Sequence, residues 1–280
     1  MDIINIILTI LSIIVTFISI LISIDQSNSC LSFILCGIIV IIEFITIILL
    51  IKQRKQYGLI VPKNGGIADF KLYKMFWKRE IISKDLPNRQ SLERGYLRVF
   101  GKDVERYQIL LVDFVLKKNV KEVILAVDIT TNPKRLLTRK EYHEKNREFI
   151  FADNVIKRVL IIDRKNLNDN IFINDLYEVI MLNKSIGVHI SLITTDYLNS
   201  DQILDFIIYG NSVVITEGHQ ASENYETGDS QLWFLSDEIE KFKSLFKVIK
   251  ERSDMYEQCD KFLKKCDIKE GKVINFKNEI

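Results

Sequence analysis

Two long apolar runs at the start of the chain constrain its architecture more than any other feature. Residues 3–24 (IINIILTILSIIVTFISILISI) contain no charged side chain, and residues 30–51 (CLSFILCGIIVIIEFITIILLI) contain only Glu43. As helices, these 22-residue runs would each extend over about 33 Å, which matches the ~30 Å hydrocarbon core of a bilayer. We therefore expect residues 1–52 to form a hairpin of two transmembrane helices.

The flanking charges predict the orientation of this hairpin. A cleavable signal peptide is the alternative for the first run, but no basic segment precedes it. The connecting loop carries only Asp25, whereas Lys52, Arg54 and Lys55 follow the second run directly. The positive-inside rule then places both termini in the cytoplasm. The Ile- and Lys-rich, Pro-poor composition suggests a bacterium, so we expect a protein of the bacterial inner membrane.

Glu43 lies near the middle of the second predicted span, where a charge is costly. Insertion scales assign ~2.5–3.5 kcal/mol to Asp, Lys or Arg at the centre of a span. The first span offers no cation, so Glu43 either meets a partner helix, lines a pathway in an oligomer, or is protonated and tolerated in lipid. Gly37, on the same span, would allow close helix contact.

Several function classes lack their sequence signals. The net charge is only +2, so no strong basic field indicates a nucleic-acid partner. The four cysteines show no zinc spacing, and no Gly-x-Gly-x-x-Gly or P-loop motif follows an expected strand. We expect neither a metal nor a cofactor.

The segment after the membrane, residues 53–110, reads as a juxtamembrane helical linker. Pro62, Gly65-Gly66 and Pro87 mark breaks in it. Its aromatic and basic side chains fit either a helix in the lipid headgroup region or a helix packed onto the following domain. Residues 91–118 have apolar side chains at helical spacing, which predicts a helix or a helix pair interrupted near Gly101.

The remainder alternates between strands and helices. Apolar runs at 122–129, 155–163 and 187–194 are separated by helical segments at 138–153 and 173–185, a pattern typical of a mainly parallel sheet. DFIIYG and SVVITE then predict a hairpin, QLWFL a short strand, and the following segment an amphipathic helix. We expect an α/β domain at 111–252 and a charged, peripheral tail at 253–280.

This order of elements resembles the phospholipase D-like fold. The resemblance rests on NVIKRVLIIDR and NKSIGVHISLIT as the second and third strands, and on DFIIYGNSVVITE with LSDEIEKFKSLFKVI as the motif hairpin and its closing helix. It implies a mixed-sheet α/β domain that corresponds to a single phospholipase D-like unit.

The catalytic motif of that family is missing here. Active members carry His-x-Lys on the first hairpin strand and an Asp five residues after the Lys. These positions correspond to Ile203, Asp205 and Gly210 in this chain. An Asp in place of the phosphate-binding Lys would repel the substrate, so the resemblance implies a fold without its phosphodiesterase chemistry.

None of the three histidines is a good replacement for the missing histidine of the motif. His143 lies in a charged segment and is expected to face solvent, and His189 reads as a core or edge histidine in a strand. His219, in the loop after the hairpin, is the least implausible catalytic or ligand-binding histidine. Thiol chemistry has no better support, because Cys259 and Cys266 read as structural thiols.

The ends of two expected parallel strands suggest a ligand edge, since ligands of such sheets bind at the carboxyl ends of the strands. A small anionic signal would contact side chains after the first and third strands: Asp128, Thr130, Thr131, Arg135, Thr194 and Thr195. Ordinary turn-forming chemistry explains the same residues and remains the alternative.

Two functions remain open from the sequence. In one, the chain is an oligomeric membrane effector whose non-catalytic cytoplasmic domain senses a signal or partner and controls membrane permeability. Its architecture resembles that of membrane effectors in bacterial anti-phage systems. In the other, it is a membrane-anchored binding or scaffold protein without conduction.

Overall fold

The structure is a computed structural model that describes residues 66–83, 86–101, 103–118, 120–217, 229–256, 258–269 and 272–276. The expected spans at 3–24 and 30–51, with Gly37 and Glu43, lie outside these ranges, as does His219. Within the described ranges, no helix is long and apolar enough to cross a membrane.

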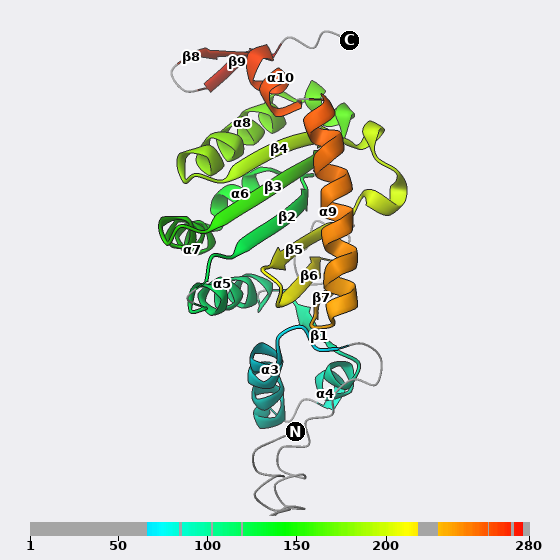
Figure 1. Ribbon diagram of the computed structural model, residues 1–280. Helices are drawn as coiled ribbons and strands as arrows, with labels where there is room; N and C mark the ends of the chain where they lie inside the picture. The colour runs from blue at the N-terminus through cyan, green and yellow to red at the C-terminus, as the bar shows by residue number, and fades with distance from the viewer. Residues whose placement is uncertain are drawn as a thin grey trace, which may run out of the picture. The chain divides into compact units, whose positions relative to one another are not determined.

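A seven-stranded mixed sheet forms the centre of the described domain (Figure 1). Its strands, in chain order, are β1 (Tyr96–Phe100), β2 (Val123–Ile129), β3 (Val155–Ile162), β4 (His189–Thr194), β5 (Asp205–Tyr209), β6 (Val213–Glu217) and β7 (Asp229–Trp233). The spatial order is β1-β7-β6-β5-β2-β3-β4. β2, β3 and β4 run parallel, and every other neighbouring pair is antiparallel. The expected α/β class, parallel strands and β5–β6 hairpin are confirmed.

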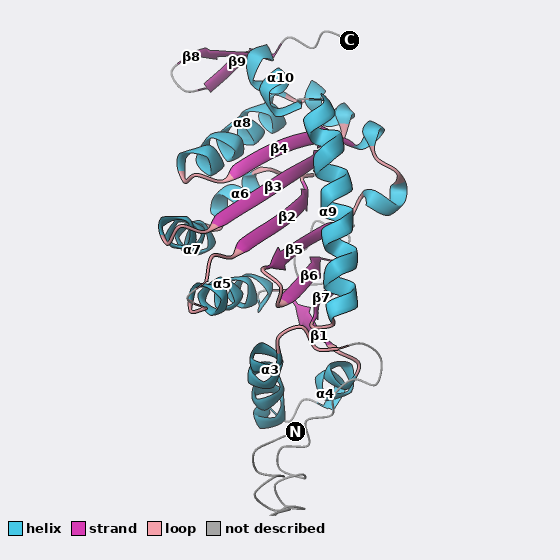
Figure 2. Cartoon of the chain, viewed as in Figure 1, coloured by secondary structure: helices cyan, strands magenta, loops and turns pink. Residues whose placement is uncertain are grey.

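Helices cover the two faces of the sheet (Figure 2). One face packs on α9 (Ser236–Tyr256), whose Ile239, Phe242 and Phe246 join a core with strand side chains such as Val127 and Val159. The helices of the other face are α5 (Asp103–Leu116), α6 (Lys134–Thr138), α7 (Lys140–Phe151) and α8 (Asn170–Ser185). Because strand side chains alternate between faces, the residues next to Val127 and Val159 point toward α5–α8.

The expected helix over 91–118 is wrong in its first half. Residues 96–100 form β1, which pairs with β7 at the edge of the sheet. Leu97 and Val99 are buried while Arg98 is exposed, a two-residue period that the longer helical spacing conceals. Gly95, at φ +86°, separates this strand from the preceding helix α4 (Leu86–Glu93). The sheet therefore begins before residue 111.

The two interpretations of the aromatic segment are now distinguished. It forms α3 (Phe70–Ser83), and its Tyr73, Phe76 and Trp77 are fully buried. The rings of Tyr73 and Phe76 lie 5.6 and 5.4 Å from that of Phe234. The Tyr73 hydroxyl donates a hydrogen bond of 2.8 Å to the Leu92 carbonyl. These aromatic side chains therefore pack onto the α/β domain.

The segment expected to be a peripheral tail also packs onto this domain. It forms α10 (Gln258–Lys265) and a hairpin of β8 (Cys266–Lys269) and β9 (Lys272–Phe276). Phe262, Cys266 and Val273 are buried in a core shared with α8, β3 and β4. Figure 1 shows α10 and this hairpin next to α8 and β4. Charged residues between these apolar positions conceal the buried face in the sequence.

Candidate functional site

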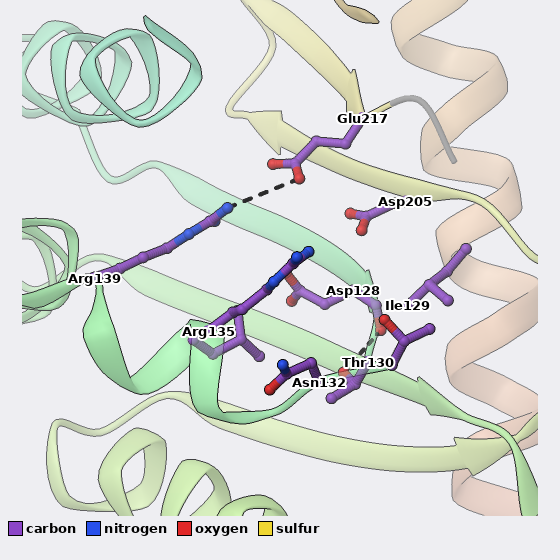
Figure 3. A pocket seen from close by; sticks show the side chains of 10 residues that line it. Asp128, Ile129, Thr130, Asn132, Arg135, Arg139, Asp205 and Glu217 are labelled. Carbon is purple, nitrogen blue, oxygen red and sulfur yellow. Dashed lines mark hydrogen bonds and ion pairs between the residues drawn. The ribbon is translucent and has the colours of Figure 1, made fainter. Parts of the chain in front are cut away.

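A polar pocket lies at the carboxyl end of β2, on the face of the sheet covered by α5–α8 (Figure 3). It is small, with a volume of about 20 Å³, which is room for about one water molecule. Its side chains come from β2 and the loop after it, from α6, and from the β5–β6 hairpin: Asp128, Ile129, Thr130, Thr131, Asn132, Arg135, Leu136, Arg139, Asp205 and Glu217.

Four of the expected ligand-edge residues meet here. Asp128, Thr130, Thr131 and Arg135 all line the pocket. The Thr130 backbone amide donates to the Ile161 carbonyl at 2.8 Å, which continues the β2–β3 ladder and fixes the start of the loop. This loop carries Arg135 back over the strand end.

The other two expected residues lie elsewhere. Thr194 lines a second, larger cavity at the ends of β3 and β4. Thr195 begins the short 3₁₀ helix η2 (Thr195–Tyr197). The strand order explains the separation, because β3 lies between β2 and β4, and two strand spacings are about 10 Å.

The hairpin adds a pair of carboxyl groups to the pocket. Asp205 and Glu217 are direct partners in the antiparallel register of β5 and β6, so their side chains share one face. Gln108 donates a hydrogen bond of 2.6 Å to Glu217, and Arg139 Nη2 lies 3.9 Å from the second Glu217 oxygen. Asp205 Oδ1 is buried without a hydrogen-bond partner among the described residues.

Burial changes the protonation of both acids. It raises the pKa of Asp205 well above its ordinary value, and the charges of Glu217 and Asp128 add to that effect. Burial and Asp128 also raise the pKa of Glu217, while Arg139 and the hydrogen bond from Gln108 oppose the rise. We infer that Asp205 retains its proton more readily than Glu217, which has both a cation and an amide donor.

Arg158 anchors the centre of this polar region. It is almost fully buried in mid-strand, and its Nε lies 3.1 Å from Asp128 Oδ2. Its two terminal nitrogens donate to Asn183 at 2.9 Å and to the Tyr142 hydroxyl at 3.3 Å. A buried charge requires such partners, so Arg158 ties β2 and β3 to α7 and α8 beneath the pocket.

His143 does not face solvent as expected. It is buried on α7, and its Nε2 lies 2.6 Å from the Leu136 carbonyl. Burial lowers the pKa of its imidazole, so the neutral form prevails at pH 7. Its Nδ1 and the amide of Asn146 have no hydrogen-bond partner among the described residues. Such buried polar groups are positions for ordered water or a ligand. His189 is exposed at the start of the edge strand β4.

The three degenerate motif positions have different surroundings in the structure. Only Asp205 lines the pocket. Ile203 packs against the core beneath α9. Gly210 begins the turn of the hairpin at φ +57°, a conformation that favours glycine, and a Cβ there would collide with the Glu122 carboxylate. An Asp at position 210 would therefore require the Glu122 side chain to move.

Sequence reasoning missed Arg139, Gln108 and Arg158 as members of the site. Of these three, only Arg158 could have been recognised from the sequence. A charged residue inside the apolar run VIKRVLII must either face solvent or have buried partners. Across the described ranges, no group of His, Cys, Asp and Glu side chains has the arrangement of a metal site. The pocket therefore offers hydrogen-bonding and charged groups rather than an evident metal centre.

Two solved structures resemble this chain distantly. No protein-family model matches the chain, and no curated protein sequence matches it. TrmBL2, an archaeal chromatin protein that binds DNA, is 16% identical with a TM-score of 0.34; the match covers 65% of this chain and 66% of TrmBL2. Polyphosphate kinase from Porphyromonas gingivalis is 7% identical with a TM-score of 0.41, over 67% of this chain and 33% of the kinase.

Proposed function

We propose that this protein is a membrane-bound effector whose α/β domain is a non-catalytic, phospholipase D-like sensor. The two N-terminal apolar runs would hold an oligomer in the bacterial inner membrane, with the domain in the cytoplasm. The domain would bind a signal or partner and thereby control an assembly that changes membrane permeability. A role in anti-phage defence fits this architecture by analogy.

The observation that carries the non-catalytic role is Asp205 itself. It occupies the position at which the resembled family places its phosphate-binding Lys, and it faces the carboxyl group of Glu217 in the pocket. Phosphoryl-transfer sites stabilise developing negative charge with cations and hydrogen-bond donors. At the position of the phosphate-binding Lys this pocket has a carboxyl group in place of a cation, and it has room for little more than a water molecule.

A second set of contacts connects the β5–β6 hairpin to α3, the first described helix of the domain. The Asp69 carboxylate accepts a hydrogen bond from the Leu72 backbone at the start of α3. It also pairs with Lys118 at 2.7 Å and accepts from Ser212, in the β5–β6 turn, at 3.2 Å. A shift of this turn would therefore change the contacts of Asp69 at the start of α3. This helix follows the predicted spans in the chain.

The non-catalytic role is tested with the full chain purified in detergent. Bis(p-nitrophenyl) phosphate serves as a general phosphodiester probe, with Asp205→Ala and His219→Ala alongside the wild type. We expect no turnover above the no-protein rate in any of the three. Hydrolysis that requires either residue would contradict a non-catalytic domain.

The membrane arrangement is tested by fusing either green fluorescent protein or alkaline phosphatase to the C-terminus in bacteria. We expect fluorescence from the first fusion and no phosphatase activity from the second, because the domain would stay in the cytoplasm. The reverse pattern would contradict the proposed topology. Chemical crosslinking in the same cells should yield oligomers, and monomers alone would argue for a simple anchor.

A further inference from the structure

A second cavity, separate from the polar pocket, lies where β3 and β4 end. Its volume is about 830 Å³, within the range of small-molecule sites. The carboxyl ends of neighbouring parallel strands, Ile162 of β3 and Thr194 of β4, contribute to its wall. Ligands of parallel sheets bind at this edge. On the opposite side, Lys261 of α10 and Phe276 of β9 line it, so the C-terminal segment completes the cavity.

The charged side chains of this cavity favour an anion. Four cations line it, Arg164, Lys165, Lys261 and Lys265, against the two carboxylates Asp163 and Asp196. They come from two elements, the 3₁₀ helix η1 (Arg164–Asn168) and α10. Two cations on one helix and two on another can contact different oxygens of one phosphate group or of two.

The ion pairs of Arg164 and Lys165 at the cavity are exposed to solvent. Arg164 pairs with Asp196 at 2.7 Å and Lys165 with Asp163 at 2.7 Å, and all four side chains are more than one-third exposed. Exposed pairs of this kind contribute little. A phosphate, with more acceptor oxygens and a higher charge, would compete effectively for Arg164, whose planar guanidinium suits bidentate binding.

Aromatic and apolar side chains line the rest of the cavity. The rings of Phe262 and Phe276 lie 5.4 Å apart, and Tyr197 lies beneath the Arg164 guanidinium at 6.0 Å. Flat aromatic ligands stack on such rings irrespective of their hydrogen-bonding pattern. The buried Thr194 hydroxyl, which has no hydrogen-bond partner within the described ranges, adds a polar group at the strand end.

We propose that this cavity binds a nucleotide, with its phosphates on the η1 and α10 cations and its base against the aromatic side chains. This inference rests on the proposed sensor role for its biological meaning, because the nucleotide would be the signal that the domain senses. Recognition of the base by stacking predicts tolerance toward different bases.

Equilibrium binding to the full chain in detergent tests this assignment with defined probes: ATP, AMP, adenosine and inorganic pyrophosphate. We expect ATP to bind, and adenosine and pyrophosphate to bind at least about tenfold more weakly, since each lacks one half of the interactions. Absence of ATP binding at millimolar concentration would overturn the assignment. Equal affinity for pyrophosphate would replace it with a site for simple phosphates.

Matched variants locate the site. Arg164→Ala and Lys261→Ala should each weaken ATP binding by about tenfold, whereas Lys264→Ala, an exposed α10 residue outside the cavity lining, should not. Phe276→Leu should weaken ATP but not pyrophosphate. Equal effects of Lys261→Ala and Lys264→Ala would contradict the site even if ATP binds.

A lipid headgroup shares part of this chemistry and is distinguished by vesicles. Flotation with phosphatidylglycerol vesicles that depends on Arg164 and Lys261, together with no ATP binding, would overturn the nucleotide assignment in favour of a lipid. These binding measurements need no membrane conduction. Failure to bind ATP is therefore distinguishable from failure of the effector role, which is measured as a change in membrane permeability.

Discussion

Replacement of Arg158 by Met should severely destabilise the domain. Met fills much of the same volume but removes a buried charge, its contact with Asp128 at 3.1 Å, and the hydrogen bonds to Asn183 and Tyr142. The side chains of Arg158 and Asp128 are only 1% and 10% exposed, so water cannot replace the lost partner well. Removal of one member of a buried ion pair costs about 3–5 kcal/mol.

Thermal unfolding of the full chain in detergent, followed by tryptophan fluorescence, measures this loss. For a domain of this size, each kcal/mol shifts the midpoint by ~2–4 °C, so Arg158→Met should lower it by about 6–20 °C. Lys157→Met is the matched control, because Lys157 is the exposed neighbour on the same strand and should change stability by less than about 0.5 kcal/mol. Equal midpoints for the two variants would refute a buried network centred on Arg158.

A second substitution checks that the network explains the effect. Asp128→Asn combined with Arg158→Met removes both charges, so the double variant should be less destabilised than the sum of the two single variants. Simple additivity would show that Arg158 contributes through packing alone. In that case the ion pair with Asp128 would carry little energy.

Three further outcomes follow from named contacts. Burial raises the pKa of Asp205 in the folded state, so wild-type stability falls as the pH rises from the unfolded pKa, about 3.9, through the folded pKa. Asp205→Asn should therefore gain stability relative to the wild type over that range. Parallel curves of unfolding midpoint against pH, measured from pH 4 to 9, would contradict this. Tyr73→Phe removes the 2.8 Å hydrogen bond from the Tyr73 hydroxyl to the Leu92 carbonyl, which keeps its bond from the Gly95 amide, and should cost about 0.5–1.5 kcal/mol in the same unfolding assay. An unchanged midpoint would show that this bond contributes nothing to stability. Phe262→Ala should expose α10 and β8–β9 to limited proteolysis, whereas Ile274→Ala, 65% exposed, should not; identical digestion patterns would argue against the shared core.

The strands of this domain could be predicted where most of their side chains are apolar. β2, β3 and β4 are parallel strands whose side chains are mostly buried, so their sequences read as hydrophobic runs despite the charged Lys157 and Arg158 in β3. β1 was not predicted because its buried residues Leu97 and Val99 also fit the helical spacing of apolar residues that continues into α5. Its assignment as a strand depends on β7, which lies far along the chain.

The candidate site could be predicted only in part, for a similar reason. The residues after β2 were recognisable from the rule that ligands bind at the carboxyl edge. Their separation from Thr194 depended on the position of β3 between two strands. Gln108 and Arg139 reach Glu217 from helices distant in sequence, and no local pattern records such a contact. The C-terminal segment was misjudged because its apolar contacts lie between lysines.

Membrane potential in bacteria that express the full chain tests the effector role most directly. A potential-sensitive dye would be recorded for the wild type, Glu43→Gln and Glu43→Leu, each co-expressed with the neighbouring genes or challenged by phage. We predict that the wild type depolarises the cells on triggering and that both Glu43 variants do not. An intact potential in all three, while the domain still binds its ligand, would contradict the effector role and leave a membrane-anchored binding protein.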